Sequence, residues 1–283
     1  MSQPTVSGVG APSGGILPAL WSLITPPAFA VRVPTAAGLR YRDERQPGIA
    51  PLADVYLPDG NGPHPSVVLV HGGGFVIGSR TMKPMRFLAT RLAEAGFAVM
   101  VFDYRMILRG GRLPESLNDV QTALSWWQSQ AERFHLDQDR INMLGPSAGA
   151  SLMLLAAETF PANTLRGVIS VFGIYDFTFL SGRLVGLMRQ LLFRSRDQAL
   201  WHRHSPVTVA RTDTPLLLLH GTADDLVPIG HAECLADMRR QLGLPVETVF
   251  FDGVPHAFFN DARQPAAKQG IAAILAFLHR QAA

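Results

Sequence analysis

The sequence predicts an α/β protein, with a mostly parallel central sheet flanked by helices and a small helical cap insertion. From about residue 50 onward, short apolar runs alternate with helical patterns. Such alternation is typical of a parallel sheet with helices on both faces. The runs are apolar throughout, as expected of strands that are covered on both faces. The predicted strands are 52–57, 66–70, 97–102, 141–144, 168–172, 216–219 and 246–251.

Helices are expected between these strands. Apolar residues lie at helical spacing in 117–127 and again in 271–278, so each segment has one apolar face. Gly96 and Gly243 follow helical runs, at the position where a helix end favours glycine. In sheets of this class, ligands bind beyond the carboxyl ends of the strands. The residues that follow each strand are therefore the first candidates for function.

The 283 residues suffice for one large α/β domain, which can reach about 250 residues without splitting. We assign this domain to 51–283, with an insertion at about 177–214 that carries helical patterns at 184–193 and 198–204. A cap over the site and a helix pair covering a sheet edge both fit this insertion.

Residues 1–50 are predicted to form an N-terminal arm that packs on the domain or near the mouth of its site. The segment 16–30 is apolar and ends in small residues, but no Lys or Arg occurs in the first 31 positions. A signal peptide needs a basic region before its apolar core. We therefore favour the arm over a signal peptide.

Composition excludes several classes of function. The 25 basic and 22 acidic residues give a net charge of +3, and the basic residues form no cluster of the kind that nucleic acid requires. No uninterrupted apolar stretch of about 18 residues occurs, so no membrane span is predicted.

The single cysteine, Cys234, fits a reducing compartment, so we expect a cytoplasmic location, with secretion as the alternative. Cys234 lies in an apolar helical pattern, which predicts a buried thiol. A homodimer is compatible with the sequence.

Gly145-Pro146-Ser147-Ala148-Gly149 forms a G-x-S-x-G pattern between a predicted strand and a predicted helix. In this context the pattern places a serine nucleophile on a sharp turn. Residues two positions before and after the serine nearly touch, so both are glycine. The turn holds the hydroxyl at a helix N-terminus, whose dipole favours an oxyanion. We predict that Ser147 is a nucleophile; a chance serine in a glycine-containing loop is the alternative.

His71-Gly72-Gly73-Gly74-Phe75 directly follows the predicted strand 66–70. Acyl transfer develops negative charge on a carbonyl oxygen, and backbone N–H groups without a neighbouring Cβ can approach it closely. An H-G-G-G motif supplies one part of such an oxyanion hole, and the residue after the nucleophile supplies the other. His71 is expected to brace the loop by hydrogen bonds. The predicted oxyanion hole comprises Gly72, Gly73, Gly74 and Ala148; a flexible turn is the alternative.

An acid and a base are expected later in the chain, in the order Ser, Asp or Glu, His. Asp224 and Asp225 follow the strand 216–219, and His256 follows the strand 246–251. A buried carboxylate would hold the imidazole in the required tautomer and stabilise the imidazolium. We predict His256 as the base and one of the two aspartates as the acid. Three further histidines are interpreted as surface or packing residues, the last of them in a turn: His202, His204 and His220.

No cofactor or metal is implied. No His, Cys or Asp cluster has the spacing of metal ligands, and no G-x-G-x-x-G follows a strand.

These motifs resemble those of the hormone-sensitive-lipase-like branch of the α/β hydrolases, with its bacterial esterases and lipases. The chain is also similar to the neighbouring branch of small feruloyl-esterase-like hydrolases. The resemblance extends from about Leu52 to the C-terminus. In this family the acid follows H-G-x-x, which selects Asp224 over Asp225. The segments that carry the resemblance are 54–58, 71–75, 103–105, 113–114, 119, 145–149, 220–228 and 255–256.

The resemblance implies hydrolysis of carboxylic esters by Ser147, His256 and Asp224 through an acyl-enzyme. A small uncharged ester, of short to medium chain length or aryl, is the expected substrate, because the chain and its insertion are apolar. Phe75, Met188 and Leu192 are candidates for substrate contact, although the two residues of the insertion can equally be core. An amidase, peptidase or aryl-formamidase is the first alternative, and a non-catalytic ligand-binding protein on the same fold is the second. Pro146 departs from the family, which usually has a polar residue before the nucleophile.

Overall fold

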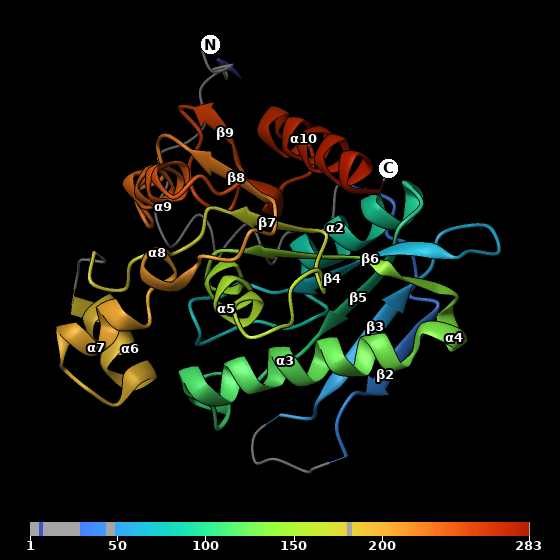
Figure 1. Cartoon of the computed structure of the whole chain (residues 1–283), viewed down its shortest axis with the longest axis horizontal. Coiled ribbons are helices and arrows are strands. Elements are labelled where there is room, and N and C mark those ends of the chain that lie inside the picture. Colours follow the sequence, from blue (N-terminus) through green and yellow to red (C-terminus); the bar gives the residue numbers. More distant parts are fainter. Residues whose placement is uncertain (1–5, 8–28, 44–48, 180–182, 283) are drawn as a thin grey trace.

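The computed structural model describes residues 6–7, 29–43, 49–179 and 183–282. These residues form a nine-stranded sheet in the order β1-β9-β8-β7-β6-β4-β5-β3-β2, which crosses the centre of the molecule (Figure 1). Strand β3 is antiparallel to both of its neighbours, and all other pairs are parallel. The strands are β1 (Val6–Ser7), β2 (Ala36–Arg40), β3 (Leu52–Tyr56), β4 (His64–Val70), β5 (Ala98–Phe102), β6 (Leu136–Pro146), β7 (Gly167–Val171), β8 (Leu216–Gly221) and β9 (Val246–Asp252).

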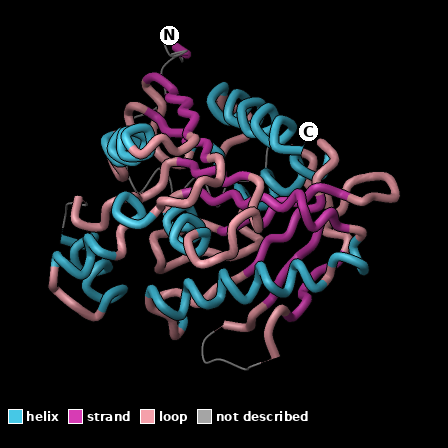
Figure 2. The backbone as a smooth tube through the Cα atoms, in the orientation of Figure 1, coloured by secondary structure: helices cyan, strands magenta, loops and turns pink. Residues whose placement is uncertain are grey.

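Helices cover both faces of this sheet (Figure 2). Two apolar cores result, one on each face. Because side chains alternate along a strand, Val68 and Val70 of β4 enter the core that contains α3, α5 and α9. Val67 and Leu69 enter the core that contains α2 and α10. The helices are α2 (Lys83–Glu94), α3 (Leu113–Ser129), α4 (Ala131–Phe134), α5 (Ala148–Ala157), α6 (Arg183–Phe193), α7 (Gln198–Arg203), α8 (Pro206–Val209), α9 (Gly230–Gln241) and α10 (Pro265–Ala282), with short 3₁₀ helices at Ile107–Arg109 and Phe258–Asn260.

The predicted fold class is confirmed, and each of the seven predicted strands is present. The helices expected over 117–127 and 271–278 lie within α3 and α10. Gly96 and Gly243 have positive φ angles of 94° and 69° just after α2 and α9, as glycines at helix ends do. Strand β2 was not predicted, because its residues are half-buried or exposed and give no apolar run.

The insertion contains α6 and α7, close to the two predicted helical patterns, and adds the short α8. The guanidinium carbon of Arg189 in α6 lies 3.9 Å from the ring centroid of Trp201 in α7, so the two helices pack together. The return to β8 is fixed by Arg239 of α9, which donates to the carbonyls of Ala210 and Thr214 at 3.2 and 2.9 Å.

The N-terminal segment contacts the domain where it is described. The ring of Phe29 lies 5.1 Å from that of Phe87 in α2, and the Arg32 amide donates to Thr90 Oγ1 at 3.1 Å. Strand β1 pairs with β9. Of the apolar segment 16–30 that was weighed as a signal peptide, residues 16–28 lie outside the described residues. In the part of the chain that is described, no helix is both long and apolar enough to cross a membrane.

The prediction of a buried thiol at Cys234 is wrong, because this side chain is exposed. Helix α9 buries His231, Leu235 and Arg239, which occupy one face at helical spacing. Two of these residues are polar, so the apolar pattern of the sequence did not reveal which face is buried. Cys234 lies on the opposite face.

Candidate active site

The backbone turns sharply at Ser147, between the last residue of β6 and the first residue of α5. Ser147 has φ 54° and ψ −124°, a strained conformation for a residue with a Cβ. A Cβ on Gly145 would lie 2.6 Å from the carbonyl carbon of Gly149, and one on Gly149 would lie 2.0 Å from the carbonyl oxygen of Val70. Both glycines are therefore required sterically, as the pattern predicted.

Pro146 ends β6 and pairs with Val171 of β7. Its missing N–H does not interrupt the ladder at the next residue, because the Ser147 amide donates to the Val171 carbonyl at 2.9 Å. A Cβ on Gly72 would lie 2.8 Å from the Pro146 carbonyl oxygen. Pro146 therefore packs between the turn at Ser147 and the backbone of Gly72.

His256 lies between Ser147 and Asp224, which come from separate segments beyond the strand ends. His256 Nε2 is 3.2 Å from Ser147 Oγ, and His256 Nδ1 is 2.6 Å from Asp224 Oδ2. A carboxylate only accepts, so Nδ1 carries the proton and Nε2 is left to accept from the serine hydroxyl. We call Ser147, His256 and Asp224 the candidate triad.

Asp224 is held as an anion in a buried position. Its Oδ1 atom accepts from the amides of Leu226 and Val227 at 3.0 and 2.8 Å. Burial alone would raise the pKa of Asp224, but hydrogen bonds from His220 and His256 outweigh burial and hold this pKa below its usual range. Asp225, the other aspartate considered as the acid, is exposed. The carboxylate that contacts His256 is that of Asp224.

His220 was interpreted as a turn residue, and this interpretation is wrong. It is a residue of β8 with no exposed surface. Its Nε2 atom lies 2.8 Å from the Val227 carbonyl oxygen and 3.3 Å from Asp224 Oδ2. The apolar run 216–219 predicted where β8 begins, but no sequence pattern pointed to this second histidine partner of Asp224. His202 and His204 are exposed, as predicted.

The glycine loop, Gly72 to Gly74, lies against the nucleophile turn. A Cβ on Gly72 would be 3.3 Å from the Cβ of Ser147, and one on Gly73 would be 1.7 Å from the carbonyl oxygen of Ile77. Gly73 and Gly74 also have φ angles of 118° and 62°. Ala148 is the first residue of α5, where a helix N–H has no intrahelical acceptor. The loop and this N–H thus both lie next to Ser147.

His71 braces the glycine loop. Its Nδ1 atom donates to the Gly72 carbonyl at 2.8 Å, and its ring stacks on Tyr104 with centroids 4.2 Å apart. Tyr104 also donates to the His71 carbonyl at 2.8 Å. Burial lowers the pKa of His71, so its ring is neutral at pH 7. Farther along the chain, Arg80 forms ion pairs with Asp54 and Asp103.

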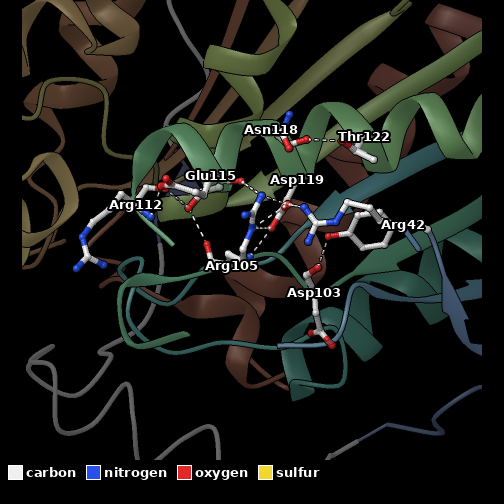
Figure 3. A network of polar contacts seen from close by, with 10 residues as sticks. Arg42, Asp103, Arg105, Arg112, Glu115, Asn118, Asp119 and Thr122 are labelled. Carbon is white, nitrogen blue, oxygen red and sulfur yellow. Dashed lines mark hydrogen bonds and ion pairs between the residues drawn. The ribbon is translucent and has the colours of Figure 1, made fainter. Parts of the chain in front are cut away.

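A buried ion-pair network fixes the segment after β5 from which Tyr104 projects (Figure 3). Asp119 of α3 accepts from the Arg105 amide at 2.8 Å and from its guanidinium at 2.7 Å. Arg42 pairs with the same carboxylate, and Tyr41 donates to the Asp103 carbonyl at 2.7 Å. The segment 103–105 is thereby tied to α3 and to the segment following β2.

Of the three candidates for substrate contact, Phe75 directly follows the glycine loop, and Met188 and Leu192 belong to α6 of the insertion. Met188 of α6 is half-buried, and its sulfur would lie 3.6 Å from a Cβ on Gly74. Phe75 is fully buried and Leu192 is 1% exposed, so both lie behind the surface. Within the described ranges, no three His, Cys, Asp or Glu side chains gather closely enough to hold a metal ion.

Comparison with known proteins identifies the family. A family model described as BD-FAE matches residues 53–238. Esterase LipC of Mycobacterium tuberculosis is 28% identical over 244 residues, which cover 78% of this chain and 60% of LipC. The probable carboxylic ester hydrolase LipM of the same organism is 30% identical over 220 residues, which cover 71% of this chain and 51% of LipM. The chain therefore matches about half to three fifths of the length of these relatives.

Solved structures show the same fold. An acetyl ester-xyloside bifunctional hydrolase from Caldicellulosiruptor lactoaceticus superposes with a TM-score of 0.76 at 17% identity, over 88% of this chain and 97% of that one. Because the family model spans well over half of the chain, this protein belongs to the BD-FAE family of α/β hydrolases.

Proposed function

We propose that this protein is a serine carboxylesterase. The observation that carries the proposal is the unbroken series of contacts from Ser147 through His256 to Asp224, at 3.2 and 2.6 Å, beside the glycine loop. A serine with such a base and a buried acid is suited to covalent acyl transfer. Curated relatives described as an esterase and as a probable carboxylic ester hydrolase support the same reaction class.

The proposed reaction has two halves. His256 Nε2 accepts the Ser147 proton as the serine oxygen attacks the ester carbonyl, and Asp224 stabilises the imidazolium that forms. The N–H groups of the glycine loop and of Ala148 donate to the tetrahedral oxyanion. The alcohol leaves with the proton from His256. Water, activated by His256, then attacks the acyl-serine and releases the carboxylic acid.

We propose a small uncharged ester, of short to medium chain length or aryl, as the substrate. Met188 lies against the glycine loop, and Leu187 on the same helix is 53% exposed. Both observations support an insertion that presents apolar side chains near the site, and they favour the cap interpretation over a helix pair at a sheet edge. We also propose a domain at 51–283 with 1–50 as an associated arm, which the contacts of Phe29 with Phe87 and of Arg32 with Thr90 support.

The test compares p-nitrophenyl esters, from acetate to laurate, with the p-nitroanilides of the same acyl groups. Wild type and Ser147→Ala are assayed side by side. We expect Ser147-dependent ester hydrolysis that is at least about 1000-fold lower in the variant, with amides cleaved far more slowly. Faster cleavage of the amides would instead indicate an amidase or peptidase. Binding of esters without any turnover would indicate a non-catalytic ligand-binding protein.

A further inference from the structure

One carboxylate oxygen of the candidate triad has two histidine partners. Asp224 Oδ2 lies 2.6 Å from His256 Nδ1 and 3.3 Å from His220 Nε2. The side chains of Asp224 and His220 are both fully buried, so water does not compete for the contact between them. The His256 contact belongs to the proposed reaction. The His220 contact is not used in the proton transfers of that reaction.

The proton of His220 is assigned by its second contact. Nε2 lies 2.8 Å from the carbonyl oxygen of Val227, which can only accept, so Nε2 carries a proton. Nδ1 of His220 is buried and has no hydrogen-bond partner within the described part of the chain. A proton at Nδ1 would be a buried donor without an acceptor, which is costly. The geometry therefore favours a neutral ring that donates from Nε2 alone.

His220, Val227 and Asp224 form a closed set of hydrogen bonds. The Val227 amide donates to Asp224 Oδ1 at 2.8 Å, while its carbonyl accepts from His220, which also lies within reach of Oδ2. Both carboxylate oxygens are thus held by groups other than the base. Rotation of the carboxylate about its terminal torsion would break these contacts and turn Oδ2 away from His256.

We propose that His220 is a positioning residue for the acid of the triad, which fixes Asp224 Oδ2 in the orientation that accepts from His256. This inference rests on the proposed function. His220 takes no part in proton transfer and does not touch Ser147. It acts on catalysis through Asp224, by keeping the carboxylate oriented when the imidazolium forms. A buried histidine that only stabilises the fold would affect folding without acting through Asp224.

His231 provides a matched control. It is also a buried histidine, 1% exposed, with an unpartnered Nε2 atom. Its Nδ1 atom accepts from the amides of Tyr175 and Asp176 at 3.3 and 3.2 Å, and no hydrogen bond joins it to Asp224 among the described residues. His231→Leu therefore removes a buried ring without removing a partner of the triad.

The experiment is a double-mutant cycle in the full chain, with p-nitrophenyl butyrate as substrate and the melting temperature as the measure of folding. His220→Leu is made in the wild type and in Asp224→Asn. His220→Gln retains an N–H donor of about the same reach. His220→Asn has a shorter amide that does not reach Oδ2, and it replaces the leucine variant if that variant does not fold.

We expect His220→Leu to lower kcat by about 10- to 100-fold with KM changed less than about threefold, as for loss of an interaction used in the transition state. His220→Gln should retain kcat within about fivefold, and His231→Leu within about threefold. In the Asp224→Asn background, His220→Leu should change kcat by less than about twofold, because residues that act together are not additive.

Two results would overturn the inference: an equal loss of kcat from His220→Leu in both backgrounds, or full kcat in His220→Leu and His220→Asn. If the wild type has no Ser147-dependent turnover, the proposed function fails and this inference fails with it. If turnover depends on Ser147 but is insensitive to His220, only the inference fails.

Discussion

A Cβ added to Gly72 would lie 3.3 Å from the Cβ of Ser147 and 2.8 Å from the Pro146 carbonyl oxygen. The glycine loop and the turn at Ser147 are therefore in close contact. This close approach explains why glycine is needed at position 72. A substitution that adds a Cβ there tests it.

Gly72→Ala is expected to lower kcat/KM by about 100-fold or more, on the scale of losing one oxyanion donor, because the added methyl must displace the loop or the turn. Gly186→Ala in α6 is the matched control, since a Cβ there meets nothing within 4 Å. That variant should keep its activity and gain about 0.5–1 kcal/mol of stability from the higher helix propensity of alanine. Steady-state kinetics measures kcat/KM of both variants, and urea unfolding measures their stability. Equal activity in the two would contradict the close approach.

The strain at Ser147 predicts a difference between two inactive variants. At φ 54° and ψ −124°, a residue with a Cβ is strained by about 1–3 kcal/mol, whereas glycine is not. Ser147→Gly should therefore be more stable to urea than Ser147→Ala, by about 1 kcal/mol after the entropy cost of glycine. Both variants lack the hydroxyl, so the comparison isolates the backbone. A less stable glycine variant would argue against strain at this turn.

Asp119→Asn is expected to destabilise the protein by about 3–5 kcal/mol, because it leaves the guanidinium groups of Arg105 and Arg42 without their buried counter-ion. Asp119 is fully buried, and Arg105 is 7% exposed. Unfolding in urea measures the loss. Asp237→Asn, which breaks an exposed pair with Arg240, is the control and should cost less than about 1 kcal/mol. Similar losses in the two variants would contradict the assigned role of the network.

His231 predicts a dependence of stability on pH. Burial is the main cause that lowers the pKa of His231 to about 4, against the opposing effects of Asp176 and Asp224. Below about pH 6.5 the unfolded ring takes up a proton that the folded ring does not. Stability from this group is complete above about pH 6.5 and is lost as pH falls toward 4.

The measurement is the free energy of unfolding of wild type and His231→Gln at pH 7 and at pH 4. The wild type should lose about 3 kcal/mol more than the variant over this interval. His204→Gln, at an exposed position, should follow the wild type. Parallel curves for wild type and His231→Gln would show that this ring does not titrate as proposed.

The parts of the site that were predicted from the sequence are local. The turn at Ser147 and the glycine loop each lie within a few residues, directly after apolar strands, so pattern and context sufficed. The order of nucleophile, acid and base along the chain then pointed to Asp224 and His256, and family spacing chose between Asp224 and Asp225.

The parts that were missed depend on how distant segments meet. Arg105 and Arg42 both pair with Asp119, but their charges look like ordinary surface charges in the sequence. His220 follows the apolar run of β8, and nothing in the sequence shows that its ring turns toward Asp224. Cys234 was assigned to the wrong face of α9. Polar residues occupy the buried face of this helix, so the pattern of apolar residues did not indicate which face is buried.

The central claim is that Ser147 is the nucleophile of a serine carboxylesterase. Its most direct test is covalent labelling of this residue. Wild type, Ser147→Ala and Ser147→Gly are incubated with a p-nitrophenyl alkyl phosphonate, and adducts are measured by intact mass and located by peptide mapping. The account predicts one phosphonyl group per wild-type chain, on Ser147, and none on either variant. A wild type that hydrolyses esters while forming no adduct on Ser147, or that carries its adduct on another residue, would contradict it.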